Sequence, residues 1–297
     1  MASKKEITKA ARDSDEWLKA RQKKHITMVQ NSMKTLQTDI LNSLNVLKMD
    51  DTGKLMRLKA NLGVAQKLQV KIEKFFYSDF NNHTRKIVRD FKSAHADIKT
   101  NFKTIGEAAK FGDVDETMTQ VLRDGYYSDF LGIGETAKQK VVQSVYDNVL
   151  AGGKFSDLES EIRQAILGSA AKGVVGSSLA QYARLYARDM IMNYHNEVML
   201  KKAEDLGMDT FIYMGTLMSK SRRFCRRRVG NPYTRTMINS WNFKWQGKSG
   251  PAMTKRGGYN CRHHWQPVRK KWLEEDEQEM LDKLWRLDKK GNPIKKK

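Results

Sequence analysis

Hydrophobic residues recur at alternating spacings of three and four in the first part of the chain, which predicts helices with one apolar stripe each. One stripe covers residues 26–47 and a second covers 55–75. The polar, glycine-containing residues 49–53 lie between them, so an antiparallel helical hairpin is expected. A third helix is predicted over 82–105. Residues 1–110 are therefore expected to form a helical, coiled-coil-like arm.

The pattern changes after this arm. Glycine becomes more frequent in residues 111–155, which predicts connecting short helices and loops. Ser156 and Glu159 have the spacing of a capping box, so the next helix is expected to begin at Ser156. Another long helix is predicted over 178–206. The aromatic and β-branched residues 210–217 predict a short strand.

Glycine, proline and tryptophan then occur at close intervals without a helical period, so loops and short strands are expected as far as residue 271. A final helix is predicted over 272–287. Its acidic residues lie in the first turns, where their interaction with the helix dipole is favourable. The predicted fold class is mainly α. It has a long N-terminal helical hairpin or bundle, then a small α+β domain over 156–271, and a terminal helix with a basic tail over 272–297.

The charge of the chain is concentrated in one segment. The 297 residues include 55 Lys and Arg against 34 Asp and Glu, a net charge of +21. Residues 219–271 hold fifteen of the basic residues and no acidic one. Such a segment indicates a polyanionic partner, and nucleic acid is favoured over a membrane because no long amphipathic helix lies there.

Other protein classes are excluded by composition. The sequence contains no run of 18 apolar residues, so no membrane span is predicted. The polar N-terminus does not resemble a secretory signal. Two cysteines provide no disulfide framework and point to a reducing compartment. The chain is therefore expected to be made in the cytoplasm and to remain out of the membrane.

Contact with the phosphates of double-stranded DNA, without sequence readout, is the binding mode that this segment predicts. The candidate phosphate contacts are the basic residues Lys220, Arg222, Arg223, Arg226, Arg227, Arg228, Arg235, Lys255, Arg256 and Arg262. Aromatic residues alternate with these bases. We expect them to form the core of the small α+β domain, while stacking on single-stranded bases is the alternative.

Cysteine and histidine residues in the same segment could bind zinc. Cys225 and the string Cys261, His263 and His264 supply ligand types that tetrahedral zinc accepts. Packing of the two cysteines in a small core is the alternative, and no other cofactor is indicated. A metal-dependent nuclease or hydrolase that uses His263 or His264 is a further hypothesis. It would need carboxylates from outside the segment, such as Asp189, Glu197 or Asp209.

One set of residues resembles a known family. Ser221 to Cys225 is followed by a Val-Gly pair at 229–230 and a Tyr-Thr pair at 233–234, and the set closes with Gly257 to Val268. This set is similar to the C-terminal domain of MuF-type minor head proteins, the head morphogenesis proteins of tailed phages. The resemblance covers about residues 156–268. Its motif positions are Phe224, Cys225, Gly230, Tyr233, Gly258, Tyr259, Asn260, Cys261, Arg262, His263, Trp265 and Pro267.

The resemblance implies a virion protein rather than an enzyme. Its expected partners are the portal protein or the major capsid protein, genomic double-stranded DNA and, through the N-terminal helices, other copies of itself. It would lie in the head interior or at the portal vertex, and an internal protein ejected with the DNA is the alternative. The chain departs from the family where Met218 falls near an acidic position and Arg223 replaces a proline. The missing acid weakens a metal or catalytic interpretation of the motif, and the added positive charge suits contact with packaged DNA.

Overall fold

The computed structural model describes residues 2–168, 178–245, 248–258, 261–283, 286–287 and 293–294. Contacts divide the chain into two units. The first unit comprises Met1–Arg21, Asp90–Gln120 and Asp189–Lys297, and the second comprises Gln22–Arg89 and Val121–Arg188. Residues of the predicted N-terminal arm therefore contribute to both units.

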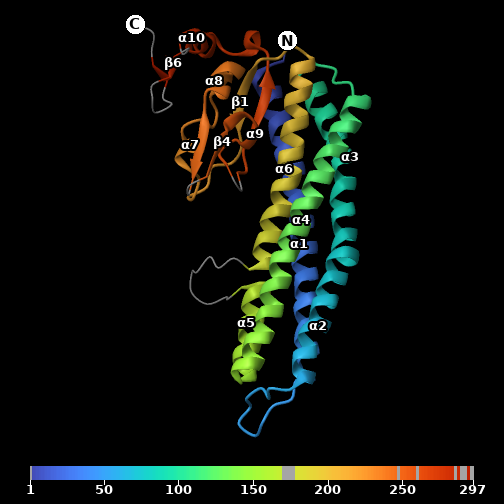
Figure 1. Cartoon of the computed structure of the whole chain (residues 1–297). Coiled ribbons are helices and arrows are strands. Elements are labelled where there is room, and N and C mark those ends of the chain that lie inside the picture. The colour runs from blue at the N-terminus through green and yellow to red at the C-terminus, as the bar shows by residue number, and fades with distance from the viewer. Residues whose placement is uncertain are drawn as a thin grey trace. The chain divides into compact units, whose positions relative to one another are not determined.

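Helices account for most of the described chain, and Figure 1 labels them in order. The long elements are α1 (Lys4–Leu44), α2 (Lys59–Lys74), the π-helix η1 (Phe75–Phe80), α3 (Asn81–Thr104), α4 (Asp113–Ala151), α5 (Phe155–Leu167) and α6 (Leu179–Asp205). The mainly α fold class and the four helices predicted over 26–47, 55–75, 82–105 and 178–206 are confirmed. None of the described helices is both long and apolar enough to cross a membrane.

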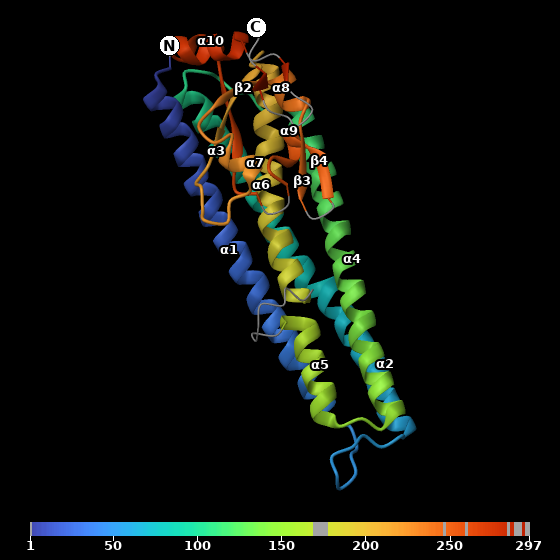
Figure 2. The same cartoon turned by 90° about the vertical axis from the view of Figure 1, so that its left-hand side faces the viewer.

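The second unit is a set of helices whose apolar stripes face inward. Both Figure 1 and Figure 2 show α2 and α5 beside the later turns of α1. Gln37 of α1 donates to the backbone oxygen of Arg163 in α5, and Lys71 of α2 donates to Ser43 of α1 at 2.8 Å. The predicted stripe residues, such as Met33 and Leu68, are buried. Burial of these stripes supplies the main stabilisation, because isolated helices are marginal in water.

The prediction of short helices and loops over residues 111–155 is wrong, because α4 is one helix of 39 residues. Its glycines suggested breaks, since each costs about 1 kcal/mol in a helix interior. Gly134 has a packing role instead. A Cβ at this position would lie 2.7 Å from the ring of Phe76, so only glycine lets this ring approach the helix so closely.

The predicted capping box at Ser156 is also wrong. The helix α5 begins one residue earlier, at Phe155, and no side chain caps it. The amide of Phe155 donates instead to the backbone oxygen of Gly53 at 3.1 Å, and the amide of Leu55 donates to Gly153 at 2.9 Å. Pairing with a distant loop thus satisfies a helix-end donor that the sequence assigned to a local serine.

The first unit contains a small antiparallel sheet with the strand order β2-β1-β5. Its strands are β1 (Thr210–Met214), β2 (Pro232–Thr234) and β5 (His264–Val268), so the strand predicted over 210–217 is confirmed in its first five residues. The shorter elements around the sheet are α7 (Arg223–Arg226), α8 (Arg235–Asn239), β3 (Asn242–Trp245), β4 (Lys248–Pro251), α9 (Ala252–Lys255), η2 (Lys270–Trp272), α10 (Glu275–Lys283), β6 (Arg286–Leu287) and β7 (Pro293–Ile294). The predicted terminal helix corresponds to α10.

Alternation along β1 and β5 gives the sheet two different buried faces. Tyr213 pairs with Trp265 in register, and their rings lie 4.4 Å apart on one face. Tyr233 and Trp241 extend this aromatic face, with their ring centroids 4.8 Å apart. The expectation that the aromatic residues form a core is confirmed for Tyr233, Trp241 and Trp265, which are all buried.

The opposite face is polar and meets helices of the same unit. Gln266 exchanges two hydrogen bonds of 2.9 and 3.0 Å with Asn101 of α3. Asn101 also donates to Ser14 of α1 at 3.0 Å, and Ser14 donates to Asp97 at 2.8 Å. His195 Nε2 of α6 lies 2.9 Å from the same carboxylate. Buried polar groups of this kind are tolerated because they are paired with one another.

Candidate functional site

The basic segment separates into exposed and internal side chains. Six of the ten predicted phosphate contacts are exposed: Lys220, Arg223, Arg226, Arg227, Lys255 and Arg262. Three others, Arg222, Arg228 and Arg235, are half-buried, and Arg256 is buried. The structure therefore supplies fewer candidate contacts than the sequence alone predicts.

Five of the exposed bases form a group, which we call the basic patch: Lys220, Arg223, Arg226, Arg227 and Arg262. The first four lie in the loop before α7, on α7 and at the residue that follows it. A nitrogen of Arg262 lies 3.3 Å from the sulfur of Met218, which places this side chain beside the same loop. Within the described part of the chain, Lys220, Arg223 and Arg262 form no ion pair with a carboxylate.

The loop before α7 is held by its own side chains. Arg226 donates to the backbone oxygens of Ser221 and Ser219, and the Ser221 hydroxyl accepts from the Met218 amide at 2.8 Å. Arg222 reaches across to the backbone oxygen of Gly257 at 2.9 Å. These contacts fix the backbone that carries the basic patch.

Arg228 is a packing residue rather than a free surface charge. Its guanidinium lies 4.0 Å from the ring centroid of Phe224 and 4.2 Å from that of Trp241, and it also donates to the Phe224 oxygen. Arg235 is half-buried over the ring of Phe211 and lies 3.8 Å from Glu204. Cation–π contacts and carbonyl oxygens satisfy these two cations within the unit.

The prediction that Arg256 contacts phosphate is wrong, because only 2% of this residue is exposed. Its guanidinium donates to Asn193 of α6 at 2.6 Å and to the backbone oxygen of Thr254. The backbone at Arg256 has a φ of +54°, which is the left-handed region. This turn after α9 directs the side chain into the unit instead of toward solvent.

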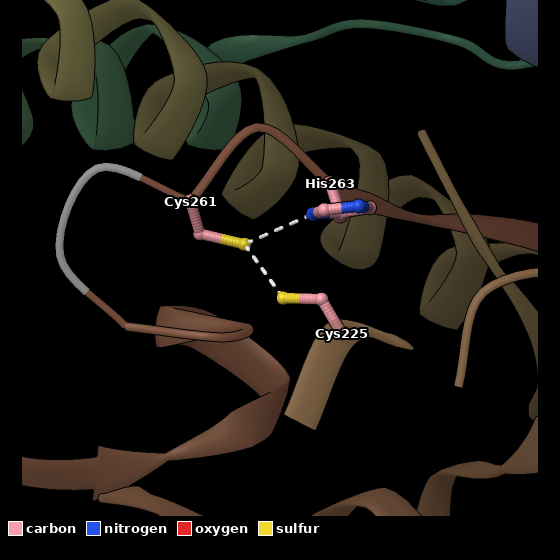
Figure 3. A group of neighbouring side chains, drawn as sticks. All are labelled: Cys225, Cys261 and His263. Atoms are coloured by element: carbon pink, nitrogen blue, oxygen red, sulfur yellow. Dashed lines mark hydrogen bonds between the residues drawn. The ribbon is translucent and has the colours of Figure 1, made fainter. Parts of the chain in front are cut away.

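Cys225, Cys261 and His263 form a compact group on the aromatic face of the sheet (Figure 3). Cys225 comes from α7, while Cys261 and His263 come from the segment that enters β5. The two sulfurs lie 3.8 Å apart, and the Cys261 sulfur lies 3.5 Å from Nδ1 of His263. All three residues are buried. Three of the four candidate zinc ligands therefore lie together in the structure.

Tyr213 and Gly257 complete the surroundings of this group. The Tyr213 hydroxyl lies 3.3 Å from the Cys261 sulfur and 3.6 Å from the Cys225 sulfur, and its ring stacks on His263. A Cβ on Gly257 would lie 2.4 Å from the Cys225 sulfur, so no side chain fits there. The hydrogen bond from Cys225, together with the charges of His263 and Arg256, holds the pKa of the Cys261 thiol well below its ordinary value.

The fourth candidate ligand, His264, does not belong to this group, so its inclusion in the predicted zinc site is wrong. Neighbouring residues of a strand face opposite sides, and His264 lies on the helix side of the sheet. Burial, together with the positive charge that the neighbouring His195 can carry, lowers the pKa of His264 to about 3. The imidazole is therefore neutral near pH 7.

The three carboxylates named for a nuclease, those of Asp189, Glu197 and Asp209, do not join the group of Cys225, Cys261 and His263. Among the described residues, one group of three or more His, Cys, Asp or Glu side chains is close enough to share a metal ion. It consists of Cys225, Cys261 and His263 and contains no carboxylate. Burial raises the pKa of Glu197, against the opposing charges of Lys255 and Arg256. Asp189 and Asp209 also stand outside the group.

The other motif positions have structural roles that the structure makes visible. Gly230 and Gly258 have φ values of +86° and +91°, which favour glycine, while Phe224 and Pro267 lie on α7 and β5. Tyr259 and Asn260 lie outside the described residues. Tyr213 was missed by the sequence reasoning. The available signal was its place on the predicted strand, because residues two apart on a strand share a face and Tyr213 therefore lies on the same face as Phe211.

Comparisons with known proteins add no assignment: no family model, no curated protein and no solved structure matches this chain.

Proposed function

We propose that the chain is a structural protein of a tailed-phage head, of the MuF minor head type, and that its basic patch contacts the phosphates of genomic double-stranded DNA. The observation that carries the DNA contact is the exposure of Lys220, Arg223, Arg226, Arg227 and Arg262 in a segment without any acidic residue. Packaged DNA would supply the opposite charge that the local sequence lacks.

The arrangement of the patch favours backbone contact over base readout. Its side chains come from the four-residue helix α7, from residues on either side of it and from the segment before β5, so no helix of groove-reading length carries them. The buried aromatic rings of Tyr233, Trp241 and Trp265 are not available for base stacking. Contact through cations alone gives binding that varies little with DNA sequence.

The phage assignment rests on the resemblance of residues 221–225 and 257–268. Several of these positions gather on the aromatic face of the sheet, which supports reading them as one structural motif rather than as scattered matches. On this proposal the helices of residues 1–110 bind the portal protein, the capsid protein or other copies of the chain. The protein would lie at the portal vertex or in the head interior.

Salt-dependent DNA binding of the full chain tests the proposed contact. Fluorescence anisotropy with labelled double-stranded DNA should give a linear fall of log K with log salt concentration. Replacing Lys220, Arg223 and Arg227 with glutamine removes three contacts at about 0.9 each, so the slope should decrease by about 2.7.

A matched control removes the same charge elsewhere. Lys23, Lys34 and Lys67 are exposed residues of the second unit, and their replacement by glutamine should leave the slope nearly unchanged. If both triple variants lower the slope equally, the basic patch is not the binding site. Mass spectrometry of purified particles tests the phage assignment separately, since absence of the chain from DNA-filled heads would contradict it.

A further inference from the structure

We propose that Cys225, Cys261 and His263 bind one structural Zn²⁺ ion, with the Tyr213 hydroxyl at the fourth corner of the site. The proposal does not depend on DNA binding or on the phage assignment, because it rests on the geometry of the buried group alone. It gives the two buried free cysteines a role as metal ligands, in place of a disulfide or of packing in a small core.

The two distances that Cys261 makes to the other ligand atoms match those that a tetrahedral zinc ion imposes. Zinc binds cysteine sulfur at about 2.3 Å and histidine nitrogen at about 2.0–2.1 Å. At tetrahedral angles these bond lengths place two sulfurs about 3.8 Å apart and a sulfur about 3.6 Å from the nitrogen. The observed separations are 3.8 Å between the sulfurs and 3.5 Å from the Cys261 sulfur to His263 Nδ1. All three ligand atoms lie within 4.8 Å of one another.

Tyr213 occupies the position where a fourth ligand would stand. Its hydroxyl oxygen is 3.6 Å from the Cys225 sulfur and 3.3 Å from the Cys261 sulfur. A tetrahedron with a zinc–oxygen bond of about 2.0–2.2 Å has a sulfur–oxygen edge of about 3.5–3.7 Å, so the first distance fits and the second is slightly short. The Tyr213 ring stacks on His263, and the Tyr213 hydroxyl and His263 Nδ1 lie 3.3 and 3.5 Å from the Cys261 sulfur. Gly257 lacks the side chain that would otherwise fill the approach to the Cys225 sulfur.

The chemistry of the group selects zinc over the common hard cations. Thiolate and imidazole ligands favour Zn²⁺, whereas Mg²⁺ and Ca²⁺ require oxygen ligands. Two thiolates balance the charge of one Zn²⁺ ion, so the metal adds no net charge to the positive segment around it. Burial of every ligand is typical of a structural site rather than a catalytic one.

Zinc at this place would join segments that the small sheet connects only weakly. Cys225 lies on α7, and Cys261 is 36 residues later in the segment that leads into β5. The three-stranded sheet is short, and small folds of this kind commonly use a metal or disulfides to compensate for a limited core. The metal would therefore stabilise the backbone on both sides of the basic patch.

Metal analysis of the full chain, purified under reducing conditions without a chelator, tests the proposal. We expect one zinc ion per chain, which a mercurial reagent releases as it modifies the two thiols. Replacement of zinc by Co²⁺ should give the visible absorption of a tetrahedral site and thiolate-to-metal charge transfer. Wild-type protein that neither retains zinc nor takes up Co²⁺, or that contains a Cys225–Cys261 disulfide in reducing buffer, overturns the proposal.

Single variants locate the ion. Cys225→Ser and His263→Asn should lose the bound zinc, while Arg262→Gln, at an exposed position between two ligands, should retain it. Zinc that stays stoichiometric in Cys225→Ser overturns the site. Tyr213→Phe should keep the thiolate-to-cobalt band and bind zinc more weakly. An unchanged zinc affinity in this variant overturns the assignment of the fourth corner.

Discussion

The paired amides of Asn101 and Gln266 offer a sharp test of how the first unit is stabilised. They join α3 to β5 in the interior, where Gln266 is 0% and Asn101 3% exposed. Each amide donates to the oxygen of the other, at 3.0 and 2.9 Å. Replacing either residue with leucine leaves part of its partner without a hydrogen bond in a site that water does not reach.

The structure predicts different costs for the two replacements. Gln266→Leu removes the donor to Asn101 Oδ1, but the Asn101 amide nitrogen keeps its acceptors on Ala10 and Ser14. One unsatisfied buried acceptor costs about 1–3 kcal/mol. Asn101→Leu removes the amide that donates to Ala10, Ser14 and Gln266. Because more groups then lose a partner, we expect about twice that cost. The double replacement should cost less than the sum of the two, because neither unpaired amide then remains.

Urea unfolding followed by tryptophan fluorescence measures these costs in the first structural unit, where both residues lie. All six tryptophans lie in the segments that form the first unit, so their emission reports its unfolding separately from the helices of the second. Circular dichroism reports both units together. A Gln266→Leu variant as stable as the wild type, or costs that add fully in the double variant, would refute the reasoning.

Three further changes have clear expected outcomes. Gly63→Ala in α2 meets open space and should raise the free energy of unfolding by about 0.5–1 kcal/mol in thermal melts followed by circular dichroism. Arg228→Met loses cation–π contacts with Phe224 and Trp241, so stability should fall by about 1–2 kcal/mol in urea, while the salt slope of DNA binding stays constant. Glu197→Gln removes a carboxylate whose folded pKa burial raises. Because the folded state binds that proton more tightly, the variant should gain stability at pH 7, and the gain should vanish below pH of about 4.3, in urea titrations at both pH values.

Hydrophobic periodicity was sufficient to predict most helices, because burial of one stripe is a local property of the sequence. The stripe over residues 26–47 belongs to α1, and the stripe over 178–206 belongs to α6. The prediction was wrong where packing overrode a local preference. Gly134 interrupts no helix, since the ring of Phe76 lies against it, and Ser156 caps no helix, since a distant loop supplies the acceptor for Phe155.

The sequence was sufficient to predict which residue types could form the candidate site, but not which face of the sheet each residue occupies. Cys261 and His263 were recognised as possible ligands from their spacing alone, and the structure places them together. His264 and Tyr213 were misjudged because neither the start of β5 nor its register with β1 was known. Once His264 is known to begin a strand, two-residue alternation separates it from His263 and brings His263 to the face of Tyr213.

The absence of acidic residues from 219–271 does not mean that every base there awaits a polyanion. Arg222, Arg226, Arg228 and Arg256 all donate to backbone oxygens of their own unit, so carbonyl dipoles partly take the place of carboxylates. Ten phosphate contacts would give a salt slope of about 9, whereas the six exposed bases limit it to about 5. A measured slope well above that limit would require internal cations such as Arg256 to leave their partners when DNA binds.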